Sequence, residues 1–225
     1  ILTATGSNTI SGSVVSASGA INLTGTVVSG AITGSSSTIN LTGGSVAGNV
    51  TSNGAITTSG TAVTGALTSN SGTISLTAGS VGGLVTSGCC TVTTTNTNLS
   101  GGARSNSGSL QITGGTIQGP FFAGNNPATF SAVTMTSGSV TGASTITFTN
   151  SLVGGASSPV ILTSTSNEIT LNNTTVFGDL TAPSYSTVRV NSPSKVYGTC
   201  LPNSTPANAC ISNPATACFT DDFNR

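Results

Sequence analysis

The feature of this sequence that most constrains its fold is a short internal repeat. A step of one apolar residue, one variable residue and one glycine recurs at a nearly constant short interval through the first half of the chain. It begins at Ile10, Val28, Val46, Val63, Val81, Leu99 and Ile117. Further copies begin at Val140, after a longer interval, and at Val176, with a looser copy at Val196. A fixed short period predicts a solenoid, in which each repeat forms one coil that packs on the next.

Each period also carries a pair of apolar residues two positions apart, such as Ile21 with Leu23 and Ile39 with Leu41. Another apolar position, for example Val14, follows the step by four residues. A spacing of two is the strand period, and no stretch shows helical spacing. The sequence therefore predicts an all-β protein, a β-solenoid (β-helix) of about ten to eleven 18-residue coils. Three short sides per coil are favoured over two.

The repeat also suggests boundaries within the chain. We expect a β-solenoid rod over residues 1–198, with a loop insertion near 120–127 where five residues are added to the period. Phe121 and Phe122 in that segment are either a binding patch or packing residues. Packing is favoured, because Phe121 holds the apolar position four residues after Ile117. Residues 199–225 are rich in Pro and Cys and lack the repeat, so they are expected to form a tail or a linker to a domain outside this chain.

Charge is scarce throughout the chain. Only 4% of residues are charged and there is no His, where an ordinary soluble domain is roughly 25% charged. Acid–base, metal and phosphate chemistry draw on the missing residue types, so we expect no enzyme activity, no catalytic residue, no cofactor and no metal site. The net charge of zero gives no electrostatic reason for binding nucleic acid. No apolar run is long enough for a membrane span, and Glu168 is expected to be an isolated, solvated residue.

Polar residues form a second periodic signal. The residue after each apolar pair predicts an outward ladder made of Thr24, Thr42, Thr77, Thr95, Thr113 and Thr136. The residue two positions earlier is Asn22, Asn40, Ser75, Thr93, Gln111 or Thr134. Regular Thr ladders on flat solenoid faces can bind ice. Polar strand formers facing solvent produce the same pattern for structural reasons alone, and this second interpretation is favoured.

The five cysteines divide into two groups. Cys89 and Cys90 are expected on a strand, where side chains alternate, so one would be a core residue and the other exposed. Cys200, Cys210 and Cys218 lie in the Pro-rich tail, where one disulfide is expected. Cys200–Cys210 closes a short loop and is favoured over a bridge involving Cys218.

The ends of a solenoid are edges, and an uncovered edge strand can pair with another chain. Repeat-like sequence starts within the first ten residues, and no charged cap precedes it. We therefore expect the first coil to contact another polypeptide by strand addition. The candidate contact residues are Ile1, Leu2, Thr3, Thr5 and Thr9.

The last residues, ACISNPATACFTDDFNR (209–225), resemble a junction in exported bacterial proteins of the MshQ type, which are associated with mannose-sensitive haemagglutinin pili. In that family the segment leads into a concanavalin-like, lectin-like domain. The resemblance implies that the rod is the stalk of a longer surface protein and that any glycan is bound by a domain outside this chain.

The sequence thus predicts a non-enzymatic, extracellular structural or adhesive protein of a bacterial surface appendage. Its expected partners are neighbouring copies or other appendage proteins. The alternatives, in order, are a fibre subunit that stacks end to end by strand addition, an ice-binding protein that uses the Thr ladder, and a polysaccharide-processing enzyme.

Overall fold

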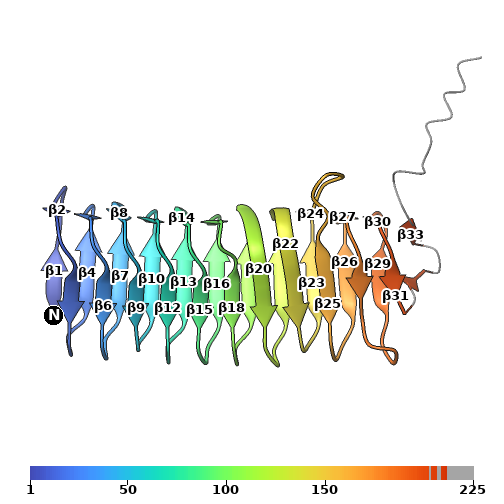
Figure 1. Ribbon diagram of the computed structural model, residues 1–225, viewed down its shortest axis with the longest axis horizontal. Helices are drawn as coiled ribbons and strands as arrows, with labels where there is room; N and C mark the ends of the chain where they lie inside the picture. Colours follow the sequence, from blue (N-terminus) through green and yellow to red (C-terminus); the bar gives the residue numbers. More distant parts are fainter. Residues whose placement is uncertain (203, 207–208, 212–225) are drawn as a thin grey trace, which may run out of the picture.

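The computed structural model describes residues 1–202, 204–206 and 209–211, and shows a rod of stacked coils with the N-terminus at one end (Figure 1). Within those residues every regular element is a strand. Strands of successive coils pair in parallel, and the stack has about 11 turns of roughly 18 residues. The predicted β-solenoid is therefore confirmed. Most coils contribute three strands, as expected for a three-sided coil, and in two coils one long strand spans the second and third sides.

The first side of the rod is a 12-stranded parallel sheet. Its strands, in order along the rod, are β1 (Leu2–Ala4), β4 (Ile21–Thr24), β7 (Ile39–Thr42), β10 (Ile56–Ser59), β13 (Ile74–Thr77), β16 (Val92–Thr95), β19 (Leu110–Thr113), β21 (Ala128–Ser131), β23 (Ile146–Thr149), β26 (Ile169–Asn172), β29 (Val188–Asn191) and β32 (Ser204–Thr205).

The second and third sides belong to one 21-stranded sheet, because two long strands span both sides. These long strands are β20 (Thr116–Ala123) and β22 (Thr134–Gly142). The second side also contains β2 (Thr9–Ile10), β5 (Val27–Val28), β8 (Ser45–Val46), β11 (Ala62–Val63), β14 (Ser80–Val81), β17 (Asn98–Leu99), β24 (Leu152–Val153), β27 (Thr175–Phe177), β30 (Lys195–Tyr197) and β33 (Cys210–Ile211). The third side also contains β3 (Val14–Ser16), β6 (Ile32–Gly34), β9 (Val50–Ser52), β12 (Leu67–Ser69), β15 (Val85–Ser87), β18 (Ala103–Ser105), β25 (Ile161–Ser164), β28 (Leu180–Thr181) and β31 (Cys200–Leu201).

The core consists of columns of apolar side chains that run along the rod. Val28, Val46, Val63 and Val81 occupy successive rungs of one column and are almost fully buried, as predicted from the repeat. The middle of the rod holds larger residues: Phe121 contacts Phe130 edge to face, and Phe130 stacks on Phe148 with ring centroids 4.4 Å apart. Phe121 is thus a packing residue, as favoured above. Burying these columns is the main source of stability for a chain with so few charges.

The turn that connects the first side to the second has glycine and threonine alternately at one position in successive coils. Gly44 and Gly79 have positive φ, and a Cβ on either would lie within 2.2 Å of a backbone oxygen of the coil below. The coils that alternate with these two carry Thr26, Thr61 and Thr97 at the same place. The Thr61 hydroxyl donates a hydrogen bond to the Gly43 carbonyl, 3.0 Å away. A coil with glycine at this position therefore packs closely on a coil with threonine there. The repeat period alone does not predict this alternation.

The prediction of a loop insertion near residues 120–127 is wrong. Residues 120–123 belong to β20, which pairs with β18 in the regular register of the repeat. The register shifts by only one residue, at a bulge in the pairing of β20 with β22. Met135, not Val140, is the next copy of Ile117, and Val140 continues the column of Phe121. The Val-x-Gly sequence at Val140 has the form of the repeated step, but it lies on the third side of the coil rather than on the second.

The inserted residues instead lie at 154–160, between β24 and β25, where Figure 1 shows a loop projecting from the rod. Val153 pairs with Met135, one regular period before it, and with Val176, which follows only after a longer interval. Gly155 and Ser158 close the loop through two backbone hydrogen bonds of 3.1 and 3.0 Å. A Cβ on Gly154 would lie 3.2 Å from the Val160 nitrogen, so the two ends of the loop are adjacent.

We predict that deleting residues 155–159 leaves the coils intact. The deletion joins neighbouring backbone ends and restores the usual interval between the columns of Val153 and Leu162. Because the loop contributes little to the core, the melting temperature measured by circular dichroism should change by only a few degrees, corresponding to about 1 kcal/mol or less. A broad, non-cooperative melt would show that the loop is required for the stack.

The rod also extends beyond the predicted boundary at residue 198. Cys200 pairs with Leu180 and Cys210 with Val196, so part of the expected tail forms a further coil. A disulfide joins Cys200 to Cys210, as favoured from the sequence. Cys218 lies outside the described residues. The Asp179 carboxylate accepts hydrogen bonds from the backbone N–H and hydroxyl of Thr199, both 2.8 Å long, which hold the pKa of Asp179 below its ordinary value.

Candidate functional site: the outward face of the 12-stranded sheet

The outward residues of the 12-stranded sheet form two parallel columns. The column that contains most of the predicted ladder comprises Thr24, Thr42, Ser59, Thr77, Thr95, Thr113, Ser131, Thr149, Asn172 and Asn191. The second column comprises Thr3, Asn22, Asn40, Thr57, Ser75, Thr93, Gln111, Thr129, Thr147, Thr170, Arg189 and Thr205. Five of the six predicted ladder residues therefore do lie in one outward column.

The sixth predicted residue, Thr136, does not belong to the ladder. It lies in β22 between Met135, which pairs with Ile117, and Ser137, which pairs with Gln118. Thr136 is thus the extra residue of the bulge, and its hydroxyl donates a 3.5 Å hydrogen bond to the Ile117 carbonyl. The sequence placed Thr136 in the ladder because it follows the apolar pair Val133 and Met135. The inward pair of that coil is instead Ala128 and Phe130, so Ser131 holds the ladder position.

The sequence pattern also missed the rung formed by Thr57 and Ser59. This coil is one residue shorter than its neighbours, and its inward pair is Ile56 with Thr58, so the second apolar residue is replaced by a buried threonine. The register of β10 with β7 and β13 is nonetheless continuous. The usable signal was the position of Ile56, which continues the series of inward residues from Ile39 to Ile74.

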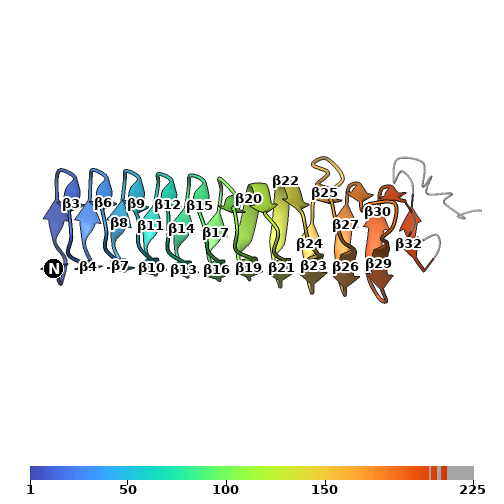
Figure 2. The same cartoon turned by 90° about the horizontal axis from the view of Figure 1, so that it is seen from below.

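The middle six strands of this side carry most of the hydroxyl groups. We call their outward residues the central hydroxyl face: Thr57, Ser59, Ser75, Thr77, Thr93, Thr95, Gln111, Thr113, Thr129, Ser131, Thr147 and Thr149. Figures 1 and 2 show these strands, β10 to β23, side by side along the rod. The 154–160 insertion does not interrupt them, because Ile146 of β23 still pairs directly with Ile169 of β26.

Among the residues that the structure describes, charge enters this side of the rod only near its C-terminal end. Arg189 lies in an outward column, and its guanidinium donates to the Glu168 carboxylate at 3.2 Å. Glu168 also accepts a hydrogen bond from the Thr170 hydroxyl. Glu168 is therefore not isolated, as the sequence suggested, because the next coil places Arg189 beside it. A pair this exposed contributes little to stability.

The cysteines in the middle of the rod differ from their predicted arrangement. Cys89 and Cys90 lie in the turn between β15 and β16 rather than on a strand, and a disulfide joins them to each other. Both are partly buried, so neither is the expected core residue. The Cys90 carbonyl accepts a 2.9 Å hydrogen bond from the buried Ser105 hydroxyl of the next coil, which ties this turn to the stack.

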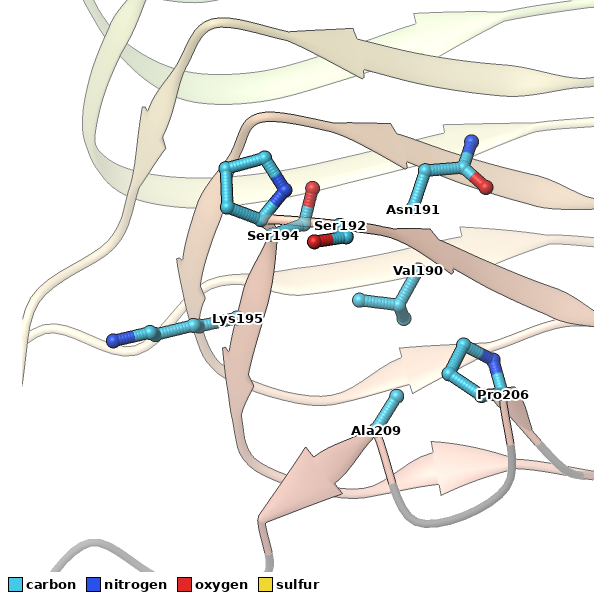
Figure 3. Close-up of a pocket in the computed structure, with 8 residues that line it drawn as sticks. Val190, Asn191, Ser192, Ser194, Lys195, Pro206 and Ala209 are labelled. Carbon is cyan, nitrogen blue, oxygen red and sulfur yellow. The ribbon is translucent and has the colours of Figure 1, made fainter.

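A shallow hollow lies at the C-terminal end of the rod, between the β29–β30 turn and the last coil (Figure 3). Its lining residues are Val190, Asn191, Ser192, Pro193, Ser194, Lys195, Pro206 and Ala209. In Figure 3 the amino group of Lys195 points away from the others. The lining residues are mostly small and neutral, and they include no pair of titratable side chains that could act as acid and base.

The predicted end contacts lie on a free edge of the described structure. β1 pairs with β4, and β2 pairs with β5, and neither has a second neighbour among the described residues. Ile1 is 91% exposed and Leu2 is 41% exposed, although Leu2 continues an inward column. Thr3, Thr5 and Thr9 are also exposed. Strand addition at this edge stays a prediction.

The fold defines the class of the protein, a parallel β-solenoid with three-sided coils. The chain has no significant match among protein-family models, curated proteins or solved structures. Within residues 1–202, 204–206 and 209–211, no three His, Cys, Asp or Glu side chains gather as they would around a metal ion. No helix suited to crossing a membrane occurs in the part of the chain that the structure describes.

Proposed function

We propose that this protein is a non-enzymatic, extracellular structural and adhesive rod of a bacterial surface appendage, and that the central hydroxyl face is its contact surface. The observation that carries this proposal is the continuity of the face. Six neighbouring strands keep one register and present two unbroken columns of uncharged polar side chains. A straight, repetitive surface of this kind suits contact with another extended surface better than recognition of a small molecule, which needs a concave site.

Adhesion through such a face depends on many weak contacts that act together. A single threonine or serine hydroxyl contributes little on its own, since a hydrogen bond to it replaces one to water. Contacts on one rigid body add up, because each contact holds the next at a high effective concentration. The rod supplies that rigidity through its continuous buried columns.

Two further observations support an extracellular location. Two disulfides, Cys89–Cys90 and Cys200–Cys210, fit an oxidising compartment. The C-terminal sequence resembles exported proteins of pilus-associated systems, in which such a segment precedes a lectin-like domain. In this proposal the rod is a stalk, with other appendage proteins or neighbouring copies as its partners.

Adsorption of the purified full chain to a hydroxyl-terminated monolayer, followed on a quartz crystal microbalance, tests the proposed contact surface. The variant combines Thr95→Lys with Thr113→Lys, on adjacent rungs of the face. The matched control combines Thr68→Lys with Thr86→Lys, on adjacent rungs of the third side. We expect the face variant to bind at least about tenfold more weakly and the control to bind like the parent. Equal loss in both variants would contradict the proposed contact surface.

Fibre assembly is a second candidate function, favoured by the edges of β1 and β2 that have no second neighbour among the described residues. Strand addition to these edges would join rods end to end through backbone hydrogen bonds. Electron microscopy of the purified chain, before and after Lys is placed at Thr5 and Thr9, tests it. Filaments that dissolve into single rods would support strand addition, whereas filaments unchanged by both substitutions would refute it.

A further inference from the structure

The central hydroxyl face differs from the rest of its sheet in how many of its outward side chains have a hydrogen-bond partner within the protein. Toward both ends, outward amides bond to each other: Asn40 donates to Asn22 at 2.7 Å, and Asn191 donates to Asn172 at 2.7 Å. Within the central hydroxyl face, only Gln111 and Thr149 have a hydrogen-bond partner among the described side-chain and backbone groups. The other hydroxyl groups of this face are therefore available to bind something outside the protein.

These free hydroxyl groups form a fixed two-dimensional array. Successive rungs are about 4.8 Å apart, and the two columns are about 6.6 Å apart because their residues are two positions apart on each strand. Most members are threonine, whose branched side chain is restricted at χ1. Each strand is held by neighbours on both sides and by buried inward residues such as Ile74 and Val92. The array is thus ordered before any ligand arrives, which lowers the entropic cost of binding.

The chemistry of the face narrows the kind of ligand. From β1 to β26 no outward residue of this side is charged, and none is aromatic. An ionic or acidic surface would find no opposite charge here. A sugar polymer would find no aromatic ring on which to stack its apolar faces. What remains is a neutral, regular array of donors and acceptors with threonine methyl groups between them, which matches a neutral lattice of water.

We propose that the central hydroxyl face binds ice. Its hydroxyl groups would hydrogen-bond to water molecules of the crystal surface, and the methyl groups between them would lie against the lattice and exclude liquid water. No bond is made or broken except hydrogen bonds. This inference rests on the proposed adhesive role of the same face and names its target as a crystalline neutral surface.

Growth of ice from a solution of the full chain tests the inference. Ice is grown slowly on a cold finger, and the fraction of protein incorporated is compared for the parent, Thr95→Tyr with Thr113→Tyr, and Thr68→Tyr with Thr86→Tyr. The tyrosines add bulk without charge, and circular dichroism checks that each variant remains folded. We expect the parent and the third-side control to enter the ice, and incorporation of the face variant to fall at least about tenfold.

A parallel measurement with crystalline cellulose separates this inference from the proposed function. Exclusion of the parent from ice, together with face-dependent binding to cellulose or to the hydroxyl monolayer, would overturn ice binding and leave the adhesive role standing. Exclusion from ice without binding to either surface would overturn both. Equal incorporation of the face and control variants would overturn the assignment of ice binding to this face.

Discussion

Val46→Asp should unfold several coils of the rod. Val46 is 2% exposed and lies in one column between Val28 and Val63. A carboxylate at this position would lie in a narrow apolar core without a partner, which costs several kcal/mol. Each coil is held mainly by its two neighbours, so the damage should spread to the adjacent rungs. Thermal melting followed by circular dichroism should show a large drop in the transition temperature or a loss of cooperativity.

Ser45→Asp is the matched control for this substitution. Ser45 precedes Val46 on the same strand, but its side chain points outward and is partly exposed. The same carboxylate placed there remains hydrated, and the change in the free energy of unfolding should be about 0.5 kcal/mol or less. A Val46→Asp protein that melts within a degree or two of the parent would contradict the inward column.

Gly44→Ala should strongly destabilise the rod. Gly44 has φ of +68°, and a Cβ placed on it would be 2.1 Å from the Thr26 carbonyl oxygen of the coil below. That oxygen belongs to the backbone, so a rung must shift to make room for the methyl group. The expected loss is the cost of a left-handed conformation, about 1–2 kcal/mol, plus a further 1–3 kcal/mol, approximately, for overpacking.

Gly60→Ala separates these two contributions. Gly60 has φ of +63°, close to that of Gly44, but nothing lies within 4 Å of an added Cβ. Its substitution should therefore show the conformational cost alone. Chemical denaturation of both variants gives the comparison. Equal losses in the two would mean that adjacent coils do not approach each other as closely at this turn as the structure shows.

Much of the fold was predictable because the inward apolar residues repeat with the coil. The step at Val28, Val46, Val63 and Val81 identifies one inward column of the second side. The pair at Ile21 and Leu23 identifies the inward residues of the 12-stranded sheet. Side chains alternate along a strand, so the inward residues also determine which residues face outward. For this reason most of the Thr ladder could be placed before the structure was known.

The errors arose where one residue changes the register. The bulge at Thr136 shifts β22 by one position, and a shift of one exchanges the two faces of a strand. Val140-Thr141-Gly142 then has the appearance of the repeated step while occupying the column of Phe121. The close approach of Gly44 to Thr26 also could not be predicted, because it depends on contacts between neighbouring coils rather than on the period itself.

The most direct test of the central claim, that the rod adheres through its central hydroxyl face, is the reactivity of single thiols on the adsorbed protein. Thr95→Cys places a thiol on the face, and Thr86→Cys places one on the third side of the rod, both in a Cys218→Ser background. The rate of maleimide labelling is measured for each variant, free in solution and bound to the hydroxyl-terminated monolayer. We expect that binding slows labelling of the Thr95→Cys variant at least about tenfold and leaves that of the Thr86→Cys variant nearly unchanged. Equal protection of both thiols, or protection of the Thr86→Cys variant alone, would contradict it.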